Sequence, residues 1–190
     1  MTVPVATSPF QIGTLVPDIE AARHCHESGF GVGPWVDSGW KTGRYWDGDT
    51  NTVLDVRQRA VFGRLTADLA IEFIQVAAAG PAPRVWDLER ADATAHLGYW
   101  ARDTRTAAAA LVAAGARLVM ARATDPDLAA ALTARGPEDP LPEGLDMCYL
   151  ATGDGLLVEL VPTAIWGGRL RDGFGDGIDD VLAAPPTDLL

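Results

Sequence analysis

The sequence predicts an α+β fold of two tandem β-α-β-β-β modules, whose strands form one curled mixed sheet around a cleft. Two observations carry this prediction. A short motif at residues 11–18 returns at 96–103, and an apolar segment around Glu72 returns around Glu159. The two pairs lie 85 and 87 residues apart, and such agreement between two landmarks indicates an internal duplication.

Each module is expected to begin with a strand that leads into a helix. The segments QIGTLVPD (11–18) and HLGYWARD (96–103) share a polar residue, an aliphatic residue, a glycine and a final aspartate. Aspartate is a favourable N-cap because its carboxylate accepts from the free N–H groups of the first turn. The helices are predicted over 19–28 and 104–114. Gly29 and Gly115 are suited to end them in the left-handed conformation.

Each module is expected to end in a β-hairpin. Aliphatic and β-branched segments flank a short polar turn at 61–65 and 69–76, and again at 147–151 and 156–161. Each half therefore reads β-α-β-β-β. The predicted organisation is an N-terminal tail (1–9), a first module (10–85), a second module (92–165) and a C-terminal tail (166–190).

Two long segments interrupt the duplicated pattern. Residues 37–59 are polar and aromatic, and residues 122–146 carry four prolines around a short alanine-rich helix. Long connections in compact domains are often functional loops. We expect both segments to border the cleft, with Trp40 and Trp46 contacting a ligand. The alternative is surface decoration.

Composition excludes several classes of function. The chain has 190 residues, 48% of them hydrophobic, and a formal net charge of −11. A strongly acidic protein lacks the basic face that nucleic acid or an anionic membrane surface requires. The N-terminal residues show neither a basic region nor an apolar run, and two cysteines make no disulfide framework. A soluble, cytoplasmic protein without nucleic-acid or membrane partners is predicted.

Four polar residues occupy equivalent positions in the two modules. Gln11 and His96 open the first strands, and Glu72 and Glu159 lie in the last strands between apolar neighbours. A duplicated fold with a pseudo-twofold axis brings such positions together. A lone acid in an apolar strand is costly unless it is paired or metal-bound. Two carboxylates, one imidazole and one amide suit a divalent ion, so the cleft is predicted to bind metal.

At this point the chain resembles the vicinal oxygen chelate superfamily, the group of glyoxalase I, methylmalonyl-CoA epimerase and bleomycin-resistance proteins. The resemblance covers roughly residues 10–163 and is carried by 11–18, 31–35, 71–74, 96–100 and 158–162. It implies metal ligands at Gln11, Glu72, His96 and Glu159, and a divalent Zn, Ni, Co, Mn or Fe ion. Residues 31–35 look closer to the epimerase-like branch. However, Glu72 stands where the epimerases usually have a glutamine, and the sequence shows no cluster of basic residues that would bind the phosphates of coenzyme A.

The resemblance implies a metal-dependent isomerase, epimerase or lyase that chelates a small oxygenated carbonyl substrate. The proton would be taken by Glu159 or Glu72. We favour Glu159, because small residues in the 152–155 turn leave room for it to move. Trp40, Trp46 and Tyr149 are the predicted substrate contacts.

Other interpretations stay open. A non-catalytic protein that sequesters an antibiotic or metabolite would use an aromatic pocket and need no metal. A ring-cleaving dioxygenase would need two histidines and one carboxylate on iron, and only His96 is available among the converging positions. A homodimer is possible, and the site could be completed within one chain or across that dimer.

Overall fold

The computed structural model describes residues 9–66, 69–89 and 95–162. The first half contains β1 (Gln11–Leu15), α1 (Ile19–Phe30), β2 (Trp35–Asp47), β3 (Thr52–Arg64) and β4 (Ala70–Val76). A 3-10 helix, η1 (Arg84–Trp86), follows in the linker. The second half contains β5 (Ala95–Ala101), α2 (Thr104–Ala113), β6 (Arg117–Arg122), α3 (Pro126–Ala134), β7 (Cys148–Ala151) and β8 (Leu157–Pro162). Apart from Pro9, both predicted tails (1–9 and 166–190) lie outside the described residues.

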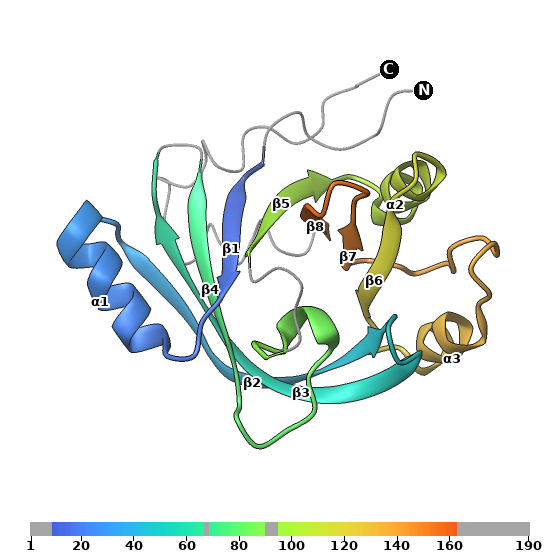
Figure 1. Cartoon of the computed structure of the whole chain (residues 1–190), viewed down its shortest axis with the longest axis horizontal. Coiled ribbons are helices and arrows are strands. Elements are labelled where there is room, and N and C mark those ends of the chain that lie inside the picture. The colour runs from blue at the N-terminus through green and yellow to red at the C-terminus, as the bar shows by residue number, and fades with distance from the viewer. Residues whose placement is uncertain (1–8, 67–68, 90–94, 163–190) are drawn as a thin grey trace.

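The strands form one curled mixed sheet that closes into a barrel, which confirms the predicted α+β fold. Their order is β1-β4-β3-β2-β6-β7-β8-β5, and β5 returns to pair with β1. The pairs β1–β4 and β5–β8 are parallel, and the other neighbours are antiparallel. Figure 1 shows α1 on one side of the barrel and α2 and α3 on the other.

The duplication is visible in the strand register. In the first half, Gly13 on β1 stands opposite Glu72 on β4. In the second half, Gly98 on β5 stands opposite Glu159 on β8. The last strand of each module therefore brings its glutamate level with the glycine of the repeated motif.

The two modules meet along β1 and β5. Gln11 pairs with Gly98, and Gly13 pairs with His96, so the polar residue of each motif lies opposite the glycine of the other. This reciprocal register is what a pseudo-twofold axis between the two strands requires. It places both polar residues beside both glutamates.

The helix caps follow from the sequence. Asp18 accepts hydrogen bonds from the backbone N–H groups of the first turn of α1, and Asp103 does the same for α2. One boundary differs from the prediction, because α1 continues through Gly29 to Phe30 and is capped by Gly31, where φ is 67°. A left-handed residue after the last turn is the usual position for glycine.

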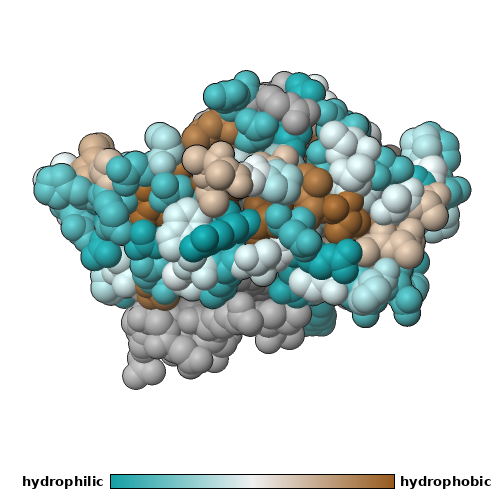
Figure 2. Space-filling model, turned by 90° about the horizontal axis from the view of Figure 1, so that it is seen from below, coloured by the Kyte–Doolittle hydropathy of each residue, from teal (hydrophilic) through white to brown (hydrophobic). Residues whose placement is uncertain are grey.

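Three apolar clusters hold the barrel and its helices. The first fills part of the barrel interior and includes Phe10 stacked on Trp100 at 3.7 Å between ring centroids. The second lies between the sheet, α2 and α3, and the third lies beneath α1. Seen from below, the outer surface is mostly hydrophilic with separate hydrophobic patches (Figure 2). No described helix is long and apolar enough to cross a membrane.

Of the two long segments, residues 37–59 border the interior cavity described below, as expected, through Ser38, Lys41, Tyr45 and Gln58. Residues 37–59 are mostly the two arms of the extended hairpin β2–β3, with a register shift between Asp37 and Trp40. The solvent exposure of much of this hairpin explains its polar sequence. Residues 122–146 carry α3, which packs on the outer side of β2 and β3. This second segment therefore contributes no wall to the interior cavity described below, contrary to our expectation.

Candidate metal centre

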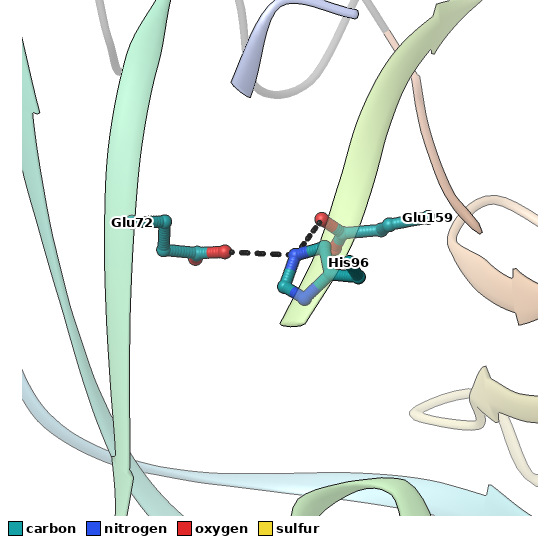
Figure 3. A group of neighbouring side chains, drawn as sticks. All are labelled: Glu72, His96 and Glu159. Carbon is teal, nitrogen blue, oxygen red and sulfur yellow. Dashed lines mark ion pairs between the residues drawn. The ribbon is translucent and has the colours of Figure 1, made fainter. Parts of the chain in front are cut away.

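The four predicted residues converge at one place inside the barrel. Gln11 comes from β1, Glu72 from β4, His96 from β5 and Glu159 from β8. Figure 3 shows the carboxylates of Glu72 and Glu159 turned toward the His96 ring from different strands. All four side chains belong to one chain, so the cluster assembles without a partner subunit.

Polar atoms of the four side chains lie within contact distance. The amide Nε2 of Gln11 donates to Glu72 Oε2 at 2.9 Å and to Glu159 Oε2 at 2.7 Å. The Nε2 atom of His96 lies 3.3 Å from Glu72 Oε2 and 3.2 Å from Glu159 Oε2. These carboxylate oxygens and imidazole nitrogen therefore face a common point.

The spacing fits a single divalent ion. With metal–ligand bonds of about 2.0–2.2 Å, neighbouring ligand atoms lie roughly 2.8–3.6 Å apart in octahedral or tetrahedral coordination. The distances from His96 Nε2 to the two carboxylates fall in this range. An amide binds metal through oxygen, so Gln11 would turn its amide to present Oε1 instead of Nε2. Glu72, His96 and Glu159 thus offer three ligands and Gln11 a fourth.

The glycines of the repeated motif make room for these side chains. A Cβ atom at Gly13 would lie 2.0 Å from Cε1 of His96. A Cβ atom at Gly98 would lie 2.5 Å from Cγ of Gln11. Both contacts are far below van der Waals distance, so each polar side chain lies across a neighbouring backbone that has no side chain.

Burial and charge perturb the cluster. Its four residues are between 2% and 6% exposed. Burial raises the pKa of Glu72, although hydrogen bonds from His96 and Gln11 oppose the shift. Burial alone would lower the pKa of His96, but hydrogen bonds to Glu159 and Glu72 outweigh it and raise the pKa to about 9. Strongly perturbed groups at a cavity wall are typical of functional sites.

A cavity opens from the cluster into the barrel. The space within it, counted to include the part open to solvent, is ≈ 590 Å³. Gln11, Glu72 and Glu159 line it. Most of the remaining wall is apolar or aromatic, with Phe10, Tyr45, Phe62, Ile74, Trp86 and Tyr149 among its residues.

Two aromatic residues with polar groups close this cavity beside the cluster. Tyr149 contacts the His96 ring edge-on at 4.9 Å between centroids, and Trp86 contacts Tyr149 at 6.0 Å. Both are buried. The Trp86 indole N–H lies beside the Tyr149 hydroxyl, but neither group makes a hydrogen bond of normal geometry. Burying such groups unpaired costs about 1–3 kcal/mol each, so they are available to a ligand.

The structure does not bring Trp40 and Trp46 into the cavity. Trp40 is 42% exposed and lies beneath the Arg57 guanidinium, 5.4 Å from the ring centroid. Trp46 is buried on the outer side of the sheet, where its indole N–H donates to Asn51. Side chains alternate along a strand, so these even-numbered positions of β2 face outward while Lys41 and Tyr45 face the cavity.

Sequence reasoning missed several cavity residues. Lys41 and Tyr45 were hidden in a segment interpreted as a loop, where alternation was not applied. Trp86 lies in the linker between the modules and has no counterpart in the repeat. One signal was available, because Lys41 is the only lysine in the chain.

The sequence places the chain in a family. A model of the Glyoxalase/Bleomycin resistance protein/Dioxygenase superfamily matches residues 10–132. The chain therefore belongs to this superfamily, which is the group that the repeated motifs resemble. No curated protein sequence gives a significant match.

Several solved structures are similar at low identity. Methylmalonyl-CoA epimerase from Mycobacterium tuberculosis is 15% identical, with 83% of this chain and 88% of that chain covered and a TM-score of 0.44. Trypanothione-dependent glyoxalase I from Leishmania major is 12% identical, with 88% and 94% covered and a TM-score of 0.29. A 4-hydroxymandelate synthase variant from Streptomyces coelicolor is 16% identical, with 83% and 37% covered and a TM-score of 0.43. The family assignment rests on the sequence match.

Proposed function

We propose that this protein is a metal-dependent enzyme that chelates a small oxygenated carbonyl compound and removes a proton beside the carbonyl. The reaction class is isomerisation, epimerisation or lyase chemistry. One observation carries the proposal: two buried carboxylates meet an imidazole and an amide at the wall of a small-molecule cavity. A homodimer and a cytoplasmic location stay predictions from the sequence.

Charge favours a cation at this point. Glu72 and Glu159 are both 6% exposed, and two buried carboxylates so close together need compensation. Protons on Glu72 and His96, whose pKa values are raised, would balance the charge without metal. A divalent ion would replace both protons and use every polar group of the cluster.

Different residues of the chain would bind the metal, accept the proton and contact the substrate. Gln11, Glu72, His96 and Glu159 would hold the ion, which when bound acts as a Lewis acid on a substrate carbonyl. One glutamate would take the proton from the adjacent carbon, because Gln11 cannot accept it and His96 is a ligand through its ring nitrogen. The unpaired Tyr149 hydroxyl would donate to a substrate oxygen, and the apolar walls would exclude water.

The structure removes our reason for preferring Glu159 as the base. Its cross-strand neighbour is Tyr149, and the 152–155 turn lies farther along the hairpin. Glu72 has Phe62 in the corresponding place, and the two acids are equally buried. Both glutamates are therefore candidate bases, and paired substitutions distinguish them.

Deuterium exchange tests the proposal. Metal-loaded protein is incubated in D₂O with a panel of 2-oxo acids and acyl thioesters, and loss of the α-proton signal is followed by NMR. We expect exchange with at least one compound. Replacing the base by glutamine keeps an oxygen ligand and lowers exchange by roughly a hundredfold or more. Normal exchange in both Glu72→Gln and Glu159→Gln would contradict a base in the metal shell.

The second candidate is a sequestering protein without turnover. The aromatic and apolar cavity wall favours it, because such a wall binds small molecules whether or not a metal is present. Tight binding by metal-free protein, with no exchange across the panel, would support this function over the enzyme.

A further inference from the structure

The single lysine of the chain faces the interior cavity. Lys41 is the one lysine among 15 basic residues, the rest being arginine. It lies on β2 and lines the same cavity as Glu72 and Glu159. The residue is solvent-exposed, so it lies at the open part of the cavity.

Neighbouring residues make this end of the cavity polar. Lys41 stands opposite Gln58 on β3, and the Gln58 amide lies beside the hydroxyl of Tyr45. The Tyr45 ring extends back over Gly43, where a Cβ atom would lie 2.9 Å from the hydroxyl oxygen. The Oε1 atom of Gln58 is buried without a hydrogen-bond partner. A lysine, an amide and a phenol therefore line this part of the cavity wall.

Lys41 has no acidic partner in the described part of the chain. No described carboxylate lies within ion-pair distance of it. By contrast, Arg59 pairs with both Glu20 and Asp37, and Arg44 pairs with Asp55. In a protein of net charge −11, an unpaired cation inside a cavity offers a local site for an anion that the overall field repels.

We propose that Lys41 binds a carboxylate at the far end of the substrate, so that the substrate carries chelating oxygens at one end and a carboxylate at the other. This inference rests on the proposed function and names its substrate class. Glu72 is level with Phe62 on β3, and Lys41 is level with Gln58, four residues away. Four residues span roughly 14 Å along a strand, which gives the offset between the two residues in the strand direction.

A carboxylate fits this end better than a phosphate. Lys41 supplies one positive charge, which matches a monoanion, and Gln58 and Tyr45 can each donate one hydrogen bond. Phosphate is usually met by several basic groups or by a helix N-terminus. The only other charged groups identified along the cavity wall, Glu72 and Glu159, are acidic.

Matched chelators test the inference by calorimetry. The probes are hydroxamic acids of graded chain length, each ending in a carboxylate or in a methyl group, added to metal-loaded protein. At one length the carboxylate should bind about tenfold tighter, a ratio equal to 1.4 kcal/mol. Lys41→Met should abolish this ratio, and Lys41→Arg should retain it. Arg44→Met, which removes a charge from the outer face of the same strand, should leave it unchanged.

A second readout, on the same metal-loaded protein, does not depend on turnover. Because Lys41 is the only lysine, acylation followed by peptide mass spectrometry reports its ε-amine separately from the α-amine. The bound carboxylate-ended probe should slow acylation of Lys41 by about tenfold, and the methyl-ended probe should not, if an ion pair protects the amine. Equal protection by both bound probes, or no carboxylate preference in the unchanged protein, would overturn the inference. Absence of deuterium exchange would contradict the proposed function and leave this readout unaffected.

Discussion

The imidazole of His96 lies against the backbone of Gly13, so closely that a Cβ atom on residue 13 would be 2.0 Å from the ring. The same relationship joins Gln11 to Gly98 across the pseudo-twofold axis. The repeated polar–aliphatic–glycine motif therefore has a physical cause. Each module supplies one ligand and, two residues later, the empty space that the other module's ligand occupies.

Gly13→Ala should damage the metal centre more than the fold. The new methyl group must displace the His96 ring, so metal affinity should fall by roughly 10- to 100-fold, the range seen when support for a metal ligand is lost. Calorimetry with Zn²⁺ or Ni²⁺ measures this. The control is Gly29→Ala in α1, where a Cβ atom meets nothing within 4 Å and the helix should gain up to about 1 kcal/mol. Equal affinities in the two variants would contradict the role of Gly13.

Among single ligand changes, His96→Ala should weaken metal binding most. Imidazole is the only strong nitrogen donor in the cluster, and the loss should exceed the roughly 10- to 100-fold range of outer-shell changes. Gln11→Ala should cost less, because a water molecule can replace an amide oxygen. Titration of both variants with the same metal gives the comparison. Binding by His96→Ala as tight as by the unchanged protein would show that the ion sits elsewhere.

Ligand binding should change the fluorescence of Trp86. Its indole lines the cavity, whereas Trp40 and Trp46 lie on the outer face of β2. The emission change caused by a chelating ligand should therefore shrink strongly in Trp86→Phe and persist in Trp40→Phe. Steady-state titration of the two variants measures the difference. If the ligand-induced emission change disappears in Trp40→Phe, Trp40 contacts the ligand and this prediction is wrong.

Asp103 should make stability sensitive to acid. Hydrogen bonds from the backbone N–H and hydroxyl of Thr106 hold its pKa below the ordinary value. The stabilisation is therefore present above the unfolded-state pKa of about 3.9 and is lost as pH falls through the lowered pKa. Asp103→Ala should cost about 1 kcal/mol near neutral pH. Urea unfolding at neutral and acidic pH should show this cost shrinking in acid.

The matched control for Asp103 is Asp55→Ala. Asp55 lies on the exposed hairpin with 72% of its side chain accessible, and its pairing with Arg44 is long at 3.7 Å. Such surface changes usually fall within about 0.5 kcal/mol at either pH. A cost for Asp103→Ala that stays constant as pH falls would contradict the capping account.

The repeat was sufficient to predict both modules and the four converging residues. Gln11, Glu72, His96 and Glu159 are polar residues in apolar strands, and that mismatch is visible in sequence. The β2–β3 hairpin could not be predicted from the sequence. Its solvent-exposed residues and the register shift after Asp37 obscure the two-residue alternation of a strand. Trp86 was also out of reach, since a linker residue enters the barrel only through the tertiary fold.

The most direct test of the central claim is the metal content of the purified protein, measured by inductively coupled plasma mass spectrometry after equilibration with divalent ions. The account predicts one ion per chain. It also predicts near-complete loss in a variant carrying Glu72→Gln and Glu159→Gln, which keeps the shape of both side chains and removes both charges. No bound ion in the unchanged protein, or the same stoichiometry and affinity in that variant, would contradict a metal centre at these residues.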